Sequence, residues 1–167
     1  MAVRPAVSLG DFSTLFALAG RSTRLRSERL LNDFGLHVGQ QFFMRCLWEQ
    51  DGSTVGDLAR RVKVEAPTAT QAVKRMEAAG MVRRTPDEQD ARRSRVWLTP
   101  LGRRTWPLVT AALAELERDL LAPFTQPERE QFMSLLLRLY ETSLPADGPG
   151  ADGTGTGPDA TGGSRAD

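Results

Sequence analysis

The pattern that most restricts the fold of this chain lies in its middle, at residues 53–99. Hydrophobic spacing there predicts a short helix at residues 54–61, a turn at residues 63–66 and a second helix at residues 67–79. Two short strands follow, at residues 81–85 and 95–99, and a polar loop at residues 86–94 joins them. A helix, a tight turn, a second helix and a hairpin are the outline of a winged helix-turn-helix. The predicted fold is therefore mainly α-helical, with a small β-hairpin as the wing.

Local signals indicate where these helices begin and end. Thr54 is followed three residues later by Asp57, which is the spacing of a capping box. Pro67 is expected at the first position of the second helix, where its missing N–H group costs nothing. Gly80 is placed to terminate that helix, because glycine accepts the left-handed backbone conformation that often follows a last turn.

The second helix has the chemistry of a DNA-reading helix. Ala69, Val73 and Met76 form one apolar side. The opposite side carries hydroxyl, amide and cationic groups and no acid, at Thr68, Thr70, Gln71, Lys74 and Arg75. Glutamine pairs with adenine, arginine or lysine pairs with guanine, and hydroxyl groups bind phosphates, so a major groove accepts this surface. Glu77 lies off this side and is expected to brace the helix. The alternative interpretation of the polar side is an ordinary solvated helix face.

The predicted hairpin is rich in arginine. Its five guanidinium groups belong to Arg83, Arg84, Arg92, Arg93 and Arg95. Arginine suits phosphate oxygens and a narrow minor groove, and the only acids of the loop are Asp87, Glu88 and Asp90. Residues 60–104 carry a net charge of +7, although the whole chain carries only +1. The hairpin is therefore predicted to contact DNA, and the alternative is an exposed loop whose charges pair internally.

Asp90 stands two residues before Arg92. In a tight loop this spacing lets the carboxylate clamp the arginine and hold the tip of the loop in shape. Asp90 is therefore grouped with Arg92, Arg93 and Arg95 as the predicted DNA-binding wing.

Long helices are predicted on both sides of this core, at about residues 11–34 and 100–143. In the second region, a heptad-like stripe runs through Trp106, Val109, Leu113, Leu116 and Leu120. These stripes suit either an ordinary core or a dimer interface. The predicted domain covers residues 8–144, with its winged-helix core at about residues 36–100.

The last 23 residues, 145–167, differ from the rest in composition. They contain seven glycines, three prolines and no large aliphatic or aromatic side chain, and they carry four aspartates against one arginine. Such a segment cannot bury enough apolar surface to offset its ordering entropy, so we expect it to be disordered.

Several function classes are disfavoured. No stretch approaches the length of a membrane-spanning helix. One cysteine and one histidine cannot build a disulfide or a histidine-based metal centre, and Cys46 is expected to pack in the core. No pairing of nucleophile and base, phosphate loop or cofactor motif is present, so neither an enzyme nor a cofactor is predicted.

At the level of motifs, the chain resembles the MarR family of bacterial transcription regulators, over roughly residues 10–143. The resemblance rests on residues 57–62, on residues 67–77 with Gly80, and on residues 90–102, which contain the wing signature D-x-R followed by L-T-x-x-G. The wing signature is the most specific of these matches, because any winged helix shares the helical ones. Gly35, Leu36 and Gln40 also resemble the beginning of the family's second helix.

The resemblance implies a homodimer held together by the terminal helices, with helix 67–79 of each protomer in a major groove and each wing in the adjacent minor groove. Arg92 would be the minor-groove residue and Asp90 its orienting partner. The implied operator is a pseudo-palindrome of double-stranded DNA. The implied role is repression of nearby genes in the bacterial cytoplasm, at the nucleoid, with release by a small aromatic or lipophilic effector.

The place of an effector pocket and the kind of partner that the wing binds stay open in the sequence. His37, Arg45, Trp48 and Trp106 are the candidates for an effector pocket, because an arginine beside an aromatic ring can hold an aromatic carboxylate. Residues 11–34 contain no cysteine, so peroxide sensing by a first-helix cysteine does not carry over. The alternative to a DNA-binding regulator is a winged-helix module that binds protein, with a merely solvated wing.

Overall fold

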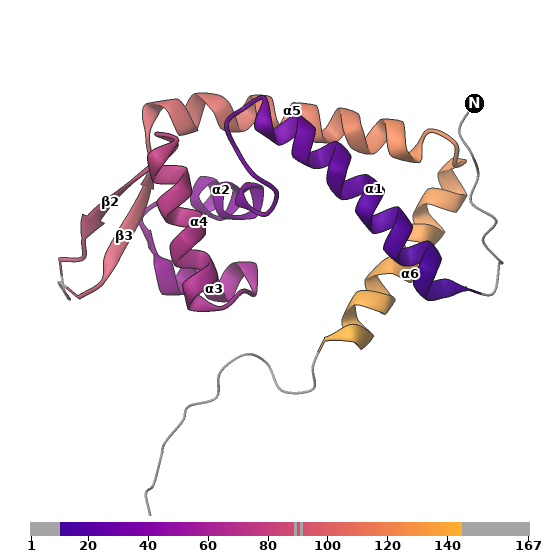
Figure 1. Cartoon of the computed structure of the whole chain (residues 1–167), viewed down its shortest axis with the longest axis horizontal. Coiled ribbons are helices and arrows are strands. Elements are labelled where there is room, and N and C mark those ends of the chain that lie inside the picture. The colour runs from indigo at the N-terminus through magenta and orange to yellow at the C-terminus, as the bar shows by residue number, and fades with distance from the viewer. Residues whose placement is uncertain (1–10, 89, 91, 145–167) are drawn as a thin grey trace, which may run out of the picture.

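The computed structural model describes residues 11–144, except residues 89 and 91, and has six helices and three strands in that part of the chain (Figure 1). In chain order they are α1 (Phe12–Asn32), α2 (Gln40–Glu49), β1 (Ser53–Thr54), α3 (Val55–Val62), α4 (Ala66–Ala78), β2 (Val82–Pro86), β3 (Ser94–Leu98), α5 (Pro100–Leu121) and α6 (Gln126–Ser143). The order α3, α4, β2, β3 is the predicted helix-turn-helix with its wing. The segment 145–167, predicted to be disordered, and residues 8–10 of the predicted domain lie outside the described residues.

The wing belongs to a small antiparallel sheet with the strand order β1-β3-β2. The two long strands pair from Val82 opposite Leu98 to Pro86 opposite Ser94. The two-residue strand β1 adds Ser53 opposite Val96 on the other edge of β3. The sequence did not predict β1, because two residues are too few to show an alternation.

The hydrophobic core lies in the winged-helix half of the molecule. Its fully buried members come from α2, α3, α4, the sheet, the inner ends of α1 and α5, and the loop before α2. They include Leu31, Leu36, Met44, Leu47, Leu58, Val73, Met76, Val96 and Val109. Cys46 is partly buried and packs against this cluster, as predicted. Burial raises the pKa of the Cys46 thiol, which suppresses the reactive thiolate at neutral pH.

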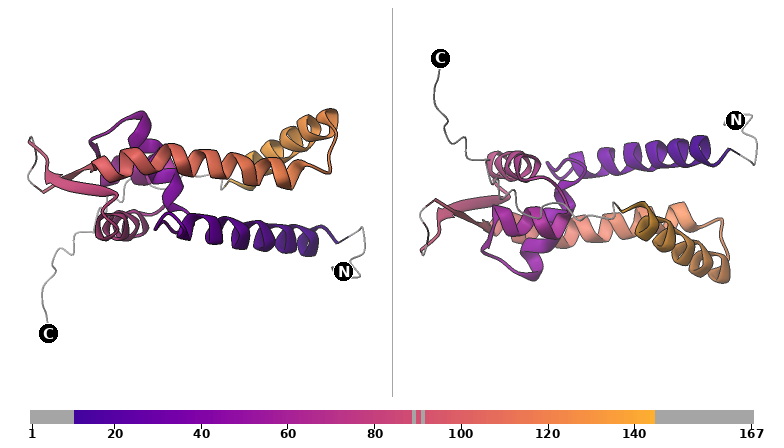
Figure 2. Two further views of the ribbon diagram at one scale, coloured as in Figure 1. Left: turned by 90° about the horizontal axis from the view of Figure 1, so that it is seen from above. Right: turned by 90° about the horizontal axis from the view of Figure 1, so that it is seen from below.

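Beyond this core, the long helices form an arm that points away from the wing. Figure 2 shows α1 and α5 both extending away from the wing, and Figure 1 shows that they lie close together at the C-terminal end of α1 and diverge toward its N-terminal end. Helix α6 turns back from the far end of α5. Leu31 is the only buried residue of α1, and α6 has none among its described residues. Large apolar side chains therefore stay exposed on α1 and α6, including Phe12, Leu15, Phe16, Phe132, Met133, Leu136 and Tyr140.

The predicted capping box forms as expected at the start of α3. The Thr54 hydroxyl accepts from the Asp57 N–H at 3.1 Å and donates to the Asp57 carboxylate at 2.7 Å. This hydroxyl contact lowers the pKa of Asp57 below its ordinary value. Lys63 ends the helix in the left-handed conformation, with φ of 59°.

Several predicted bounds shift by one residue. Pro67 is the second residue of α4 rather than the first, because the helix begins at Ala66. The strands lie one residue later in β2, and one residue earlier in β3, than predicted. Among the described residues, no helix is long and apolar enough to cross a membrane.

Candidate nucleic-acid interface

Helix α4 presents the predicted polar side to solvent. Ala69, Val73 and Met76 are fully buried against the core, which fixes the rotation of the helix about its axis. The five residues predicted to read DNA are all exposed: Thr68, Thr70, Gln71, Lys74 and Arg75. The structure therefore brings these five together on one face.

Within this face the side chains differ in how they are held. Thr70 donates its hydroxyl to the Ala66 carbonyl of its own helix at 2.9 Å, so that hydroxyl acts outward only as an acceptor. Lys74 and Arg75 have no ion-pair partner among the described residues. Two cations and the Gln71 amide thus remain free to meet phosphates or base edges.

Glu77 braces α4 against the wing, as the sequence suggested. Its carboxylate accepts from the Arg84 backbone N–H at 3.2 Å and from the Arg84 Nε at 2.8 Å. The charge of Arg84 is therefore compensated by a residue outside the loop, which simple counting of loop acids did not consider.

The base of the wing is built around the nearly buried carboxylate of Asp87. This carboxylate lies 2.5 Å from the Arg95 Nε and accepts from the Asp90 N–H at 3.0 Å. Arg95 also donates to the Gly52 carbonyl at 3.0 Å. The guanidinium of Arg95 thus connects the hairpin to Gly52, the residue just before β1, and does not extend from the tip of the wing.

The tip of the wing carries Arg92 and Arg93, both exposed. Asp90 accepts from the Arg92 backbone N–H at 3.0 Å, and its carboxylate lies 3.8 Å from the Nε of Arg93. Asp90 therefore shapes the loop through the backbone of Arg92. The spacing had suggested that Asp90 clamps the Arg92 guanidinium, and in the described structure it does not. The Arg92 side chain has no ion-pair partner in the described part of the chain.

The remaining wing arginine, Arg83, lies over the indole ring of Trp97 at 5.7 Å. Trp97 donates its Nε1–H to the Thr85 hydroxyl at 2.9 Å, across the hairpin. Of the five wing arginines, Arg84, Arg93 and Arg95 thus have carboxylate partners, whereas Arg83 on β2 and Arg92 at the tip have none among the described residues.

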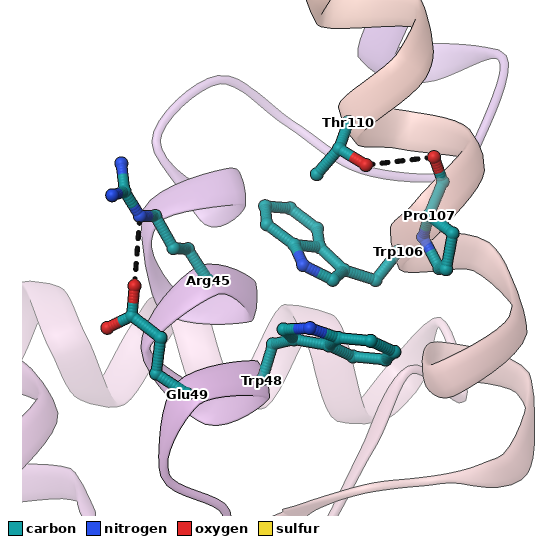
Figure 3. A pocket seen from close by; sticks show the side chains of 6 residues that line it. All are labelled: Arg45, Trp48, Glu49, Trp106, Pro107 and Thr110. Carbon is teal, nitrogen blue, oxygen red and sulfur yellow. Dashed lines mark hydrogen bonds and ion pairs between the residues drawn. The ribbon is translucent and has the colours of Figure 1, made fainter.

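Away from this surface, an open pocket of about 410 Å³ lies between α2 and α5. Figure 3 shows Trp48 of α2 and Trp106 of α5 facing the same space, with Arg45 beside them. Arg45 Nε lies 3.1 Å from the carboxylate of Glu49, which also accepts from Arg61 at 2.8 Å. One acid therefore serves two arginines.

Three of the four residues proposed for an effector pocket meet there, and the fourth does not. His37 lines a separate hollow of about 580 Å³ beside α4. That hollow is also bounded by Thr68, Gln71 and Arg75, so it adjoins the polar face of α4.

Comparison with known proteins decides the family. The sequence pattern of the MarR family matches residues 36–94. The chain is 30% identical to the HTH-type transcriptional regulator YybA of Bacillus subtilis over 131 residues, which cover 78% of this chain and 87% of YybA. The chain belongs to the MarR family.

Solved structures of MarR regulators have the same fold. A protein from Pseudomonas aeruginosa described as a probable transcriptional regulator is 31% identical, with a TM-score of 0.65, over 77% of this chain and 98% of that one. MepR of S. aureus, determined as a complex with DNA, is 25% identical, with a TM-score of 0.71, over 78% and 97% of the two chains. The predicted winged helix-turn-helix and the resemblance to the MarR family are thereby confirmed.

The geometry also explains the L-T-x-x-G part of the MarR signature. The Thr99 hydroxyl donates to the Gly80 carbonyl at 2.6 Å and accepts from the Gly102 N–H at 3.0 Å, so it caps α5 and ties it to the end of α4. A Cβ atom on Gly102 would lie 2.2 Å from the Met81 carbonyl oxygen. Only glycine lets α5 approach the wing so closely.

Proposed function

We propose that this MarR-family chain is a homodimeric, sequence-specific DNA-binding regulator that represses nearby genes. Helix α4 enters the major groove, and the tip of the wing enters the adjacent minor groove. The observation that carries the proposal is the exposed, acid-free face of α4, on which Lys74 and Arg75 lack ion-pair partners among the described residues. The MepR relative determined with DNA supports the same use of the fold.

Within the wing we assign different roles to the predicted residues. Arg92 and Arg93 contact the minor groove or its phosphates, because their guanidinium groups lie at the exposed tip. Asp90 and Arg95 hold the loop in shape, through the Arg92 N–H and the Asp87 carboxylate respectively. The activity is binding, without a catalytic step or a cofactor.

The dimer is supported by the arm of long helices. Exposed phenylalanine and leucine side chains on α1 and α6 have no covering element among the described residues, and leaving them in water costs free energy. A second copy of the chain covers them by two-fold symmetry, which makes the operator a pseudo-palindrome with half-sites about one helical turn, roughly 34 Å, apart. Such a protein acts in the cytoplasm, at the nucleoid.

An effector site is supported by the pocket between α2 and α5. Two indole rings offer apolar surface, and Arg45 offers a guanidinium whose carboxylate partner, Glu49, is shared with Arg61. This combination suits a small aromatic anion. Since the pocket lies where α5, which continues into the arm, packs against α2 of the winged-helix core, an occupant of the pocket changes the spacing of the two α4 helices and releases DNA.

Fluorescence anisotropy tests the DNA-binding function. The full chain is titrated against DNA from its own upstream region and against a scrambled duplex, over a range of salt concentrations. We expect preference for the native DNA and a log–log salt slope that corresponds to about 6–10 phosphate contacts. Equal weak binding to both duplexes, or none, would instead favour the protein-binding module.

A further inference from the structure

The end of α6 lies next to the turn between α3 and α4. Lys63 donates its Nζ–H to the Tyr140 hydroxyl at 3.0 Å and lies 5.2 Å from the centre of that ring. Figure 1 shows α6 running back from the far end of α5 toward the half that contains α3. The described chain ends at Leu144, four residues after Tyr140. The C-terminal end of α6, which precedes residues 145–167 in the chain, therefore lies close to the helix-turn-helix.

Exposed cations lie on the helix-turn-helix, together with one exposed carboxylate, that of Glu65 at the start of α4. We call Lys63, Lys74 and Arg75 the basic face; all three are exposed and have no ion-pair carboxylate among the described residues. Val62 and Val64, the chain neighbours of Lys63, line the hollow of about 580 Å³ together with Arg75 of α4. The hollow therefore extends from the turn between α3 and α4 to the DNA-reading helix.

The segment that leaves at this point carries the opposite charge. Residues 145–167 contain four aspartates and one arginine, a net charge of −3, and no lysine. The aspartates are spread along the whole segment, from Asp147 to Asp167, rather than clustered at one end.

The segment is also long enough. A chain of 23 residues can span at most roughly 76–83 Å when fully extended. The 13 residues of α4 are about 20 Å long, so the basic face lies within reach of a chain tethered at its edge.

We propose that residues 145–167 act as an intramolecular competitor of DNA, whose aspartates occupy the basic face until phosphates displace them. This inference rests on the proposed function, because it requires that the same face binds DNA. The contact is electrostatic and contributes no core, so it changes affinity for DNA without stabilising the fold.

Three variants test the proposal beside the full chain. The first ends at Leu144. The second replaces Asp147, Asp152, Asp159 and Asp167 by Asn, which keeps the length and removes the charge. The third replaces the same four residues by Glu and serves as the matched control. Each is titrated by fluorescence anisotropy with the upstream DNA and with a mixed-sequence duplex.

At about 50 mM salt we expect the first two variants to bind both duplexes about threefold more tightly than the full chain, the effect of a weak contact held at a millimolar effective concentration. At about 300 mM salt the advantage falls below roughly 1.5-fold, because screening shortens the range of the charges. The Glu variant binds like the full chain. Equal affinities at low salt overturn the proposal, as does a gain from truncation that the Asn variant does not share.

A readout without DNA separates this proposal from the proposed function. The backbone amide shifts of Lys63, Lys74 and Arg75 are compared by NMR between the full chain and the chain that ends at Leu144. Differences at low salt that vanish at high salt support the contact, even if neither form binds DNA. Identical shifts at low salt overturn it, whether or not DNA binds.

Discussion

Asp87 and Arg95 form an ion pair at the base of the wing, with the Arg95 Nε 2.5 Å from the Asp87 carboxylate. The Asp87 side chain is only 5% exposed, whereas that of Arg95 is 40% exposed. A nearly buried carboxylate requires a partner, and Arg95 supplies it from the opposite strand of the hairpin. Arg95 therefore supports the structure of the wing, in contrast to the arginines whose side chains extend from its tip.

Replacing Arg95 by Met should destabilise the fold. The substitution leaves the Asp87 carboxylate without its guanidinium, and because Arg95 is partly exposed we expect a loss of about 1–3 kcal/mol of unfolding free energy, less than for a fully buried pair. Urea denaturation followed by circular dichroism measures the loss. If stability is unchanged while DNA affinity falls, Arg95 is a DNA contact and the supporting role is wrong.

Replacing Arg92 by Ala should lower the affinity for DNA and leave the stability of the fold unchanged. The Arg92 side chain has no ion-pair partner among the described residues, so the unfolding free energy should not change. Loss of a groove or phosphate contact costs about 1–3 kcal/mol of binding to DNA. Anisotropy titrations compare it with Arg118→Ala, which removes one exposed positive charge on α5 and should bind nearly as the parent chain does. Equal affinities for the two variants would contradict the assignment of Arg92.

The contrast between Arg92 and Arg95 indicates what the sequence can and cannot predict. Helices α3 and α4 were predictable because their signals are local, such as Thr54 with Asp57 and the spacing of the buried side of α4. The strand β1 was not, since its pairing with Val96 depends on a contact distant in the chain.

Charge compensation was also hidden from the sequence. Glu77 reaches Arg84 across the turn between α4 and β2, and Asp87 reaches Arg95 across the hairpin. Counting acids and bases within a loop treats all five arginines alike. Only the folded geometry shows which guanidinium groups remain free of a carboxylate.

The capping box of α3 predicts a coupled change in stability and pKa. Replacing Thr54 by Ala removes an N-cap and should cost about 1 kcal/mol of unfolding free energy. It should also raise the pKa of Asp57 toward its ordinary value, because the Thr54 hydroxyl is the main cause of the lowered pKa. An NMR titration of the Asp57 carboxyl group measures the shift.

The sign of the pH dependence follows from that lowered pKa. In the parent chain, the stabilisation from ionised Asp57 is complete above the unfolded-state pKa of about 3.9 and is lost as the pH falls through the lower folded-state pKa. The stability difference between the parent chain and Thr54→Ala should therefore shrink in acid. A difference that stays constant from pH 7 to about pH 3 would show that the carboxylate contributes nothing to the cap.

Replacing Gly102 by Ala should disrupt the junction between α5 and the wing. The new Cβ would lie 2.2 Å from the Met81 carbonyl oxygen, which belongs to the backbone and cannot rotate away. We expect a loss of about 3 kcal/mol or more, at the upper end of overpacking effects. Gly56→Ala in α3 is the control, because the nearest atom would be 3.9 Å away and no loss of stability is expected. Thermal denaturation of both variants compares them directly, and an equal Tm would contradict the close approach.

The pocket between α2 and α5 yields a pair of opposite predictions, with benzoate as the probe. Arg45 shares Glu49 with Arg61, so removing the acid should free the guanidinium, whereas removing Arg45 should abolish the charge-assisted contact. Glu49→Gln should therefore bind benzoate more tightly, and Arg45→Gln should bind it about tenfold or more weakly, as expected for a hydrogen bond between charged groups worth roughly 1.5–3 kcal/mol. Quenching of Trp48 and Trp106 fluorescence reports occupancy, because both rings line the pocket. If both variants change affinity in the same direction, or quenching persists in Trp48→Phe with Trp106→Phe, benzoate binds elsewhere and the effector site is wrongly assigned.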